Sequence, residues 1–169
     1  LSAPAGSAAL FAEDFNAYTG NHNSGQFETG WDLAHTGNLA GWSRSGGGTV
    51  HAIDHANQAG NIVNPRNFAP MMWQDNVITL NAAIPGSNTG GTPYTVDFLA
   101  SPAVYAAASQ QTGATDGLLI ELLNPADEVV ATHTHLPGAW PGGAASFSLV
   151  PDSFNYTGDG SGDLRVRIG

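Results

Sequence analysis

The chain has 169 residues, with fourteen acidic side chains against four basic ones, all of them arginine, and a net charge of -10. A surface of that charge repels phosphate backbones, so nucleic acid is excluded as an expected partner, and without a run of eighteen apolar residues no transmembrane segment is expected. Cysteine is absent from the sequence, which excludes disulfides, thiolate nucleophiles and cysteine-ligated metals.

The length suits one domain with a hydrophobic core of its own, and the sequence contains neither an internal repeat nor a domain linker. We therefore predict a single β-sandwich domain over residues 1–169. Residues 1–8 are mostly small and uncharged, and we predict that they form a flexible start, either a linker or the remnant after a signal-peptide cut. From this start we expect a secreted or cell-surface protein.

The N-terminal half carries short strand patterns separated by loops rich in glycine, asparagine and serine. Strands are predicted at residues 9–15, 48–53, 61–63 and 77–84. The next strand, residues 94–100, alternates cleanly and places Tyr94, Val96 and Phe98 on one face. Loops are predicted at residues 19–30, 85–93 and 137–145, and a strand tail followed by a loop at 102–111.

The C-terminal half continues with apolar or alternating strands. Residues 118–123 are almost wholly apolar, as expected of a strand covered on both faces. Residues 128–135 follow after a turn at 124–127, which predicts a β-hairpin. Residues 146–150 and 163–168 alternate and predict two further strands. Together these patterns predict an all-β fold, a two-sheet antiparallel β-sandwich.

Three sequence stretches resemble a known family. Residues 11–15 (Phe-Ala-Glu-Asp-Phe) and the Gly-Trp and Gly-rich turn of residues 41–51 resemble the opening of galactose-binding-like jelly rolls, and residues 117–131 are similar to their central hairpin. The whole chain also resembles secreted surface domains of planctomycete-type bacteria. The resemblance implies a jelly-roll topology and non-catalytic carbohydrate binding. One departure is that the sequence ends at Gly169 without the Asp-containing strand that usually closes such modules.

Acidic side chains suggest two places for calcium. The resemblance implies a structural Ca²⁺ held by oxygens of Glu13, Asp14 and Asn16, with a pair of solvated acids on an edge strand as the alternative. Residues 159–163 (Asp-Gly-Ser-Gly-Asp) offer oxygens at alternate positions, as the start of a calcium loop does. Leu164 stands where such a loop needs glycine, so we predict a turn entering the last strand.

Histidines form two clusters. His133 and His135 are two residues apart on a predicted strand, so their side chains share a face, with Cα atoms about 7 Å apart. That spacing suits Zn²⁺ if a third ligand arrives from a neighbouring strand. His51, Asp54 and His55 form a second, looser cluster. We predict that both clusters are polar side chains on exposed sheet faces.

The tryptophans are the best candidates for ligand binding. Trp31 and Trp42 follow glycine and precede strands, which predicts core packing for both. Trp73 lies in an apolar patch beside amide and carboxylate groups, and Trp140 lies in a Gly/Pro loop where nothing local can bury it. The predicted ligand-binding residues are Trp73, Gln74, Asp75 and Trp140.

Catalysis has little support in the sequence. No Gly-x-Ser-x-Gly elbow occurs, and Asp97 and Glu121, the acids most embedded in apolar strands, are expected to point outward from polar faces. We expect a non-catalytic carbohydrate-binding module. The alternatives are a structural or adhesion domain of a bacterial surface protein with no glycan pocket, and a polysaccharide-active or metal-dependent enzyme.

The calcium prediction has a direct test, because an ion that binds only the folded state stabilises it by mass action. Chelation with EDTA should lower the melting temperature, and excess Ca²⁺ should restore it, as followed by thermal circular dichroism. A melting curve unchanged by EDTA would argue against calcium at Glu13, Asp14 and Asn16.

Overall fold

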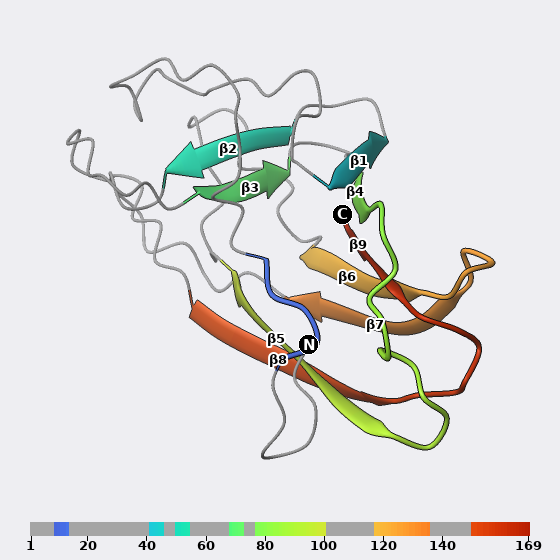
Figure 1. Cartoon of the computed structure of the whole chain (residues 1–169). Coiled ribbons are helices and arrows are strands. Elements are labelled where there is room, and N and C mark those ends of the chain that lie inside the picture. The colour runs from blue at the N-terminus through green and yellow to red at the C-terminus, as the bar shows by residue number, and fades with distance from the viewer. Residues whose placement is uncertain are drawn as a thin grey trace. The chain divides into compact units, whose positions relative to one another are not determined.

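The computed structural model describes residues 9–13, 41–45, 50–54, 68–72, 77–100, 117–135 and 150–169. Every regular element in these residues is a β-strand, and the strand pairs with defined register are antiparallel (Figure 1). The prediction of an all-β, antiparallel sandwich is therefore confirmed, whereas the jelly-roll topology stays a prediction. No helix in the described ranges is long and apolar enough to cross a membrane.

The chain divides into two compact units, residues 1–12 with 82–168, and residues 13–81 with Gly169. The prediction of one domain is not tested by this division. The predicted flexible start, residues 1–8, lies outside the described residues.

The larger unit holds five of the strands. These are β5 (Pro93–Ala100), β6 (Leu118–Leu123), β7 (Val129–His135), β8 (Val150–Thr157) and β9 (Arg165–Ile168). In one sheet β6 lies between β9 and β7, while β5 and β8 pair with each other in a second sheet. Aromatic side chains of β5 and β8 contact histidines of β7, so the two sheets form layers that face each other (Figure 1).

Alternating side chains supply the core between these layers. Tyr94, Val96 and Ala100 of β5 are buried while Asp97 is exposed, which confirms the predicted alternation. The prediction that residues 118–123 are covered on both faces is wrong for the start of β6, where Leu119 is 36% exposed. Among the described residues of this unit, the buried hydrophobic side chains are Ile84, Tyr94, Val96, Ala100, Ile120, Leu122, Leu123, Tyr156, Leu164 and Val166.

The predicted hairpin between β6 and β7 is confirmed, and Asn124 organises its turn. The Asn124 side-chain oxygen accepts hydrogen bonds from the backbone N–H groups of Ala126 (2.9 Å) and Glu128 (3.0 Å). Its backbone carbonyl accepts another from Asp127, which has a φ of 63°. Because Asn124 stabilises the turn through hydrogen bonds to residues close to it in the chain, the turn could be predicted from the local sequence.

The remaining predictions for single segments have mixed outcomes. A strand is predicted at residues 9–15. Its described part, residues 9–13, forms no strand and pairs with none of the described strands. The strand predicted at 77–84 ends at Leu80, and Ile84 makes only an isolated bridge with Leu164. The predictions for residues 19–30, 61–63, 102–111 and 137–145 lie outside the described residues, as do residues 146–149 of the strand predicted at 146–150.

A buried amide joins the loop before β5 to the loop between β8 and β9. Asn88 is only 3% exposed, and its Nδ2 donates to Asp159 Oδ1 (2.7 Å), Ser161 Oγ (3.0 Å) and the Gly162 carbonyl (3.0 Å). Its Oδ1 accepts the Asp159 backbone N–H at 2.9 Å. One buried side chain thus finds partners for both its amide nitrogen and its amide oxygen in the opposite loop.

Ser87 and Gly86, which precede this amide in the chain, each anchor one tyrosine of the second sheet. Ser87 is fully buried; its Oγ accepts the Leu164 backbone N–H at 2.7 Å, and its carbonyl accepts the Tyr156 hydroxyl. The Tyr94 hydroxyl donates to the Gly86 carbonyl at 2.8 Å, and the two tyrosine rings stack with centroids 5.0 Å apart. Burial makes the largest contribution to a raised pKa of Tyr156, and the neighbouring Tyr94 raises it further. The Tyr156 hydroxyl therefore keeps its proton and remains a hydrogen-bond donor.

The predictions of a loop at 85–93 and a turn at 159–163 are confirmed, although Pro93 itself opens β5. The two acids of the turn bond within the protein: Asp159 Oδ1 accepts the Ser161 N–H at 2.8 Å, and Asp163 Oδ1 accepts the Gly86 N–H at 2.8 Å. Their carboxylates therefore hold the loops together.

The second unit contains two antiparallel pairs. The strand β1 (Trp42–Ser45) pairs with β4 (Val77–Leu80), and β2 (Val50–Asp54) pairs with β3 (Phe68–Met72). Trp42 is 5% exposed, which confirms its predicted place in the core, while Trp31 lies outside the described residues.

Replacing Asn88 by alanine should lower the free energy of unfolding by about 2–4 kcal/mol, because it leaves the Asp159 N–H and the Gly162 carbonyl without a partner. Urea unfolding followed by tryptophan fluorescence measures the change. The matched control is Asn155→Ala, which removes an exposed hydrogen bond from Thr95 and should cost less than about 0.5 kcal/mol. Equal losses in the two variants would contradict this role for Asn88.

Candidate functional site

Three polar side chains meet between β7 and β8. His133 and His135 project from the same face of β7, because alternate residues of a strand share a face. His133 Nε2 lies 2.9 Å and His135 Nδ1 lies 2.7 Å from the same oxygen, Oδ2, of Asp152 on β8. The prediction that this histidine pair lies on an exposed sheet face is wrong, because the second sheet covers that face. We call these three residues the His–His–Asp trio.

Aromatic rings enclose the two imidazoles. The His133 ring stacks on Phe154 of β8, with centroids 5.1 Å apart and an interplanar angle of 3°. Phe98 of β5 meets His133 and His135 edge-on, at 5.8 Å and 6.1 Å. Packing of this kind restricts rotation of the imidazoles and holds their nitrogens toward Asp152.

The trio is partly shielded from solvent. The side chains of His133, His135 and Asp152 are 26%, 13% and 27% exposed. Hydrogen bonds from His133, then His135, and then the Ser153 N–H lower the pKa of Asp152 from 3.8 to about 2. Asp152 is therefore a carboxylate at neutral pH. Nε2 of His135 is buried and has no hydrogen-bond partner in the described part of the chain.

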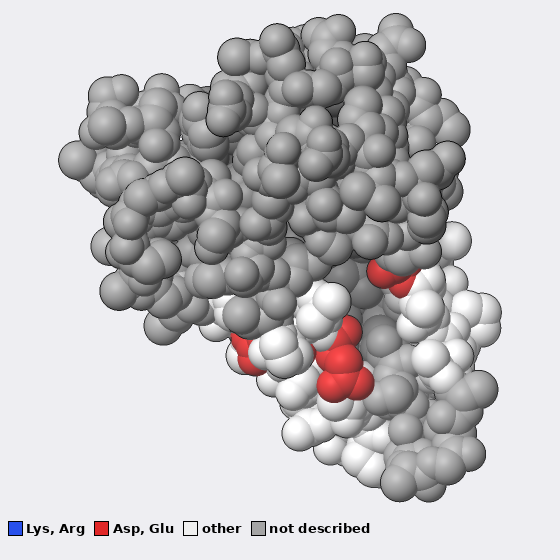
Figure 2. Space-filling model, turned by 90° about the vertical axis from the view of Figure 1, so that its left-hand side faces the viewer, with Lys and Arg blue, Asp and Glu red and all other residues white. Residues whose placement is uncertain are grey.

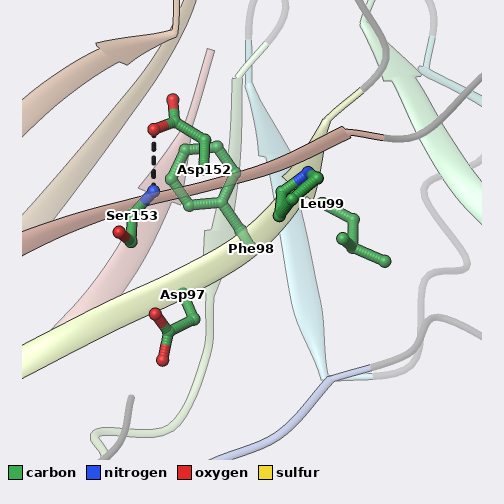
Figure 3. Close-up of a pocket in the computed structure, with 6 residues that line it drawn as sticks. Asp97, Phe98, Leu99, Asp152 and Ser153 are labelled. Carbon is green, nitrogen blue, oxygen red and sulfur yellow. Dashed lines mark hydrogen bonds between the residues drawn. The ribbon is translucent and has the colours of Figure 1, made fainter.

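An open hollow of about 410 Å³ borders the trio on β5 and β8. Its lining residues are Asp97, Phe98, Leu99, Pro151, Asp152 and Ser153. Figure 3 shows Asp97 and Asp152 on opposite sides of the two-stranded ribbon, with the Phe98 ring beside Asp152. Figure 2 shows acidic side chains on the described part of one face and no lysine or arginine among the described residues visible there. The hollow thus combines apolar surface with negative charge.

The two acids singled out from the sequence have different surroundings. Asp97 is exposed, as predicted. Glu121 of β6 is half-buried, with a side chain 16% exposed, and its Oε2 accepts a hydrogen bond from Arg167 Nε of β9 at 2.6 Å. This hydrogen bond raises the pKa of Arg167, so the pair is ionic and links neighbouring strands.

The predicted site residues fall mainly on other parts of the chain. Trp73, Gln74, Asp75 and Trp140 lie outside the described residues, as do Asp14, Asn16 and His55. Glu13 is described, and its Oε2 accepts a hydrogen bond from Trp42 Nε1 at 3.1 Å. His51 and Asp54 belong to β2, whose side chains are not described. The glycan platform and the calcium site therefore stay predictions.

Asp152 is the site residue that the sequence did not suggest. It lies in β8, where Asp152, Phe154 and Tyr156 alternate on the inner face, but the proline before it and the polar residues between obscured the strand pattern. The described residues contain no group of three His, Cys, Asp or Glu side chains that could hold a metal ion. The donor atoms of the trio instead bond directly to one another.

Comparison with protein families, with curated proteins and with solved structures finds no match. The resemblance to galactose-binding-like jelly rolls therefore stays an expectation from the sequence.

The lowered pKa of Asp152 predicts how the trio contributes to stability as pH changes. A carboxyl with a depressed pKa in the folded state stabilises the protein above its unfolded pKa of 3.8, and the contribution is lost as pH falls from there toward about 2. Asp152→Asn should therefore lower the free energy of unfolding most above about pH 4, and the difference from the parent should shrink toward pH 2.

Urea unfolding at a series of pH values, in the presence of a chelator, measures this difference. Asn155→Ala, on the same strand as Asp152 but without a titratable group, is the control and should not reproduce the pattern. If the Asp152→Asn and parent curves ran parallel from neutral pH down to about pH 2, the account of Asp152 would be wrong.

Proposed function

We propose that this chain is an extracellular, non-catalytic carbohydrate-binding module, and that the hollow on β5 and β8 belongs to its binding surface. The observation that supports the proposal is the composition of the hollow. Phe98, Leu99 and Pro151 give it apolar surface, and Asp97 and Ser153 add a carboxylate and a hydroxyl.

This mixture suits the chemistry of sugars. A pyranose ring has faces of C–H groups that pack on apolar side chains, and hydroxyls at its rim that hydrogen-bond to carboxylates and hydroxyls. Leu99 is 62% exposed and offers such a contact directly. The charge of -10 favours neutral or cationic glycans over sulfated or uronic ones.

An open site that binds a neutral ligand makes no strong charge pairs with it, so the affinity should be modest. We expect a Kd of about 0.1–1 mM, which corresponds to about 4–5.5 kcal/mol. Trp140, with Trp73, Gln74 and Asp75, is proposed as the second part of the surface, an aromatic platform on loops.

Two substitutions test the proposal by titration calorimetry against neutral and acidic polysaccharides. Asp97→Ala should weaken binding about tenfold, the equivalent of about 1.4 kcal/mol, by removing one hydrogen-bonding carboxylate. Trp140→Ala should weaken binding without loss of stability if the ring is displayed; if it caps the core, it should cost about 3–5 kcal/mol of stability instead. Thr132→Ala, exposed on β7 outside the hollow, is the matched control.

The result that would overturn the proposal is an absence of binding to any glycan at millimolar concentration. That result would favour a structural or adhesion domain. The hydrogen bonds of Asn88, which join two loops, suit a rigid domain of that kind.

A further inference from the structure

We propose that Asp159–Gly160 is a site of spontaneous isoaspartate formation, and that Asn88 protects this site in the folded protein. Aspartate followed by glycine is especially prone to the reaction, because glycine has no side chain to hinder the approach of its own backbone nitrogen. The pair occurs twice in the chain, at residues 116–117 and 159–160, and the second lies in the turn that Asn88 contacts. The inference concerns the chemical lifetime of the fold and does not depend on carbohydrate binding.

The reaction needs no reactant other than water. The Gly160 backbone nitrogen attacks Cγ of Asp159, a new C–N bond forms, and the carboxyl OH leaves with the amide hydrogen as one water molecule. The cyclic imide that results then takes up one water molecule at either of its two carbonyl groups. One opening regenerates aspartate. The other leads the main chain through the former side chain, which adds one carbon atom to the backbone.

Both reacting groups are exposed, yet both are held by hydrogen bonds. Asp159 and Gly160 lie at the surface, so water reaches them. Oδ1 of Asp159 accepts hydrogen bonds from Asn88 Nδ2 at 2.7 Å and from the Ser161 N–H at 2.8 Å. The Gly160 N–H donates to the Asn88 carbonyl at 3.1 Å. Asn88 therefore holds the carboxylate with its side chain and the attacking nitrogen with its main chain.

These contacts oppose the reaction in two ways. Attack requires the Gly160 nitrogen to give up its hydrogen, which the hydrogen bond to the Asn88 carbonyl retains. The reaction also proceeds through the neutral carboxyl group, because a carboxylate lacks a good leaving group. Hydrogen bonds from the Ser161 hydroxyl, from the Ser161 N–H and from Asn88 lower the pKa of Asp159, so its side chain stays ionised at neutral pH.

The protection lasts only while the two loops stay together. Asn88 lies in the loop before β5 and Asp159 in the loop after β8, so an opening that parts the loops breaks the bonds of Asn88 to both reacting groups. The reaction rate in the folded protein is then set by the fraction of molecules that are open. An isoaspartate at this position moves the carboxylate out of place, so the damaged chain loses its hydrogen bonds to Asn88.

The test compares the full chain in buffer and in concentrated urea, at the same pH and temperature. Isoaspartate at residue 159 is measured over time by peptide mapping with mass spectrometry and by labelling with protein isoaspartyl methyltransferase. We expect formation in urea and a rate at least about tenfold lower in the folded protein, which corresponds to an opening free energy of about 1.4 kcal/mol or more. The second Asp-Gly pair, residues 116–117, is the internal reference in urea, where the two pairs should react at similar rates.

Variants assign the protection to Asn88. Asn88→Ala should raise the rate in the folded protein toward the rate in urea, because it removes the amide that holds Asp159. Ser161→Ala keeps the backbone N–H and should have a smaller effect. Asn155→Ala removes an exposed hydrogen bond elsewhere on β8 and is the matched control, with an unchanged rate. Circular dichroism checks that each variant is folded, and Asn88→Ser, which keeps one polar group at this position, replaces Asn88→Ala if that variant is not.

Three results would overturn the proposal. The first is an absence of isoaspartate at residue 159 even in urea, which would mean that the bond is not a modification site. The second is an equal rate in the folded and the unfolded parent, which would mean that the fold gives no protection. The third is an unchanged rate in the folded Asn88 variant, which would assign the protection to other contacts. None of the three bears on sugar binding, which is measured at the hollow on β5 and β8.

Discussion

The buried side-chain amide of Asn88 is the interaction on which the larger unit depends most. It links the loop before β5 to the loop after β8, and backbone hydrogen bonds continue the link, with Gly91 N–H donating to the Gly158 carbonyl and Gly158 N–H donating to the Thr92 carbonyl, both at 2.8 Å. A Cβ atom on Gly158 would overlap the Thr89 carbonyl oxygen, so glycine is required where the loops cross. The start of β5 and the end of β8 are therefore held together by contacts outside the strands.

This link also positions the candidate site. The register set at the loop end continues along the ribbon, where Tyr94 lies opposite Tyr156 and Phe98 lies opposite Asp152. Because side chains alternate between faces, a slip of one residue would turn Asp152 away from His133 and His135. The polar loops at one end thus determine whether a carboxylate meets two imidazoles near the other end.

Local patterns could be predicted from the sequence, and distant pairings could not. The alternation in β5, the apolar run of β6 and the Asn124 turn are properties of neighbouring residues, and all three were predicted from the sequence. The third member of the trio was missed, because β8 mixes polar residues with a proline and is stabilised by pairing with β5, far away in the chain. The histidine spacing was visible in the sequence, but which sheet covers that face is set by tertiary packing.

The ribbon of β5 and β8 has only two strands in the described part of the chain, so each strand has an edge that is not paired with a described strand. Open edges invite another chain to add a strand. Proline opens β5 at Pro93 and stands second in β8 at Pro151, and each removes an N–H that such an intruding strand would need. At these two positions an added strand finds no backbone donor, which opposes edge-to-edge aggregation at high concentration.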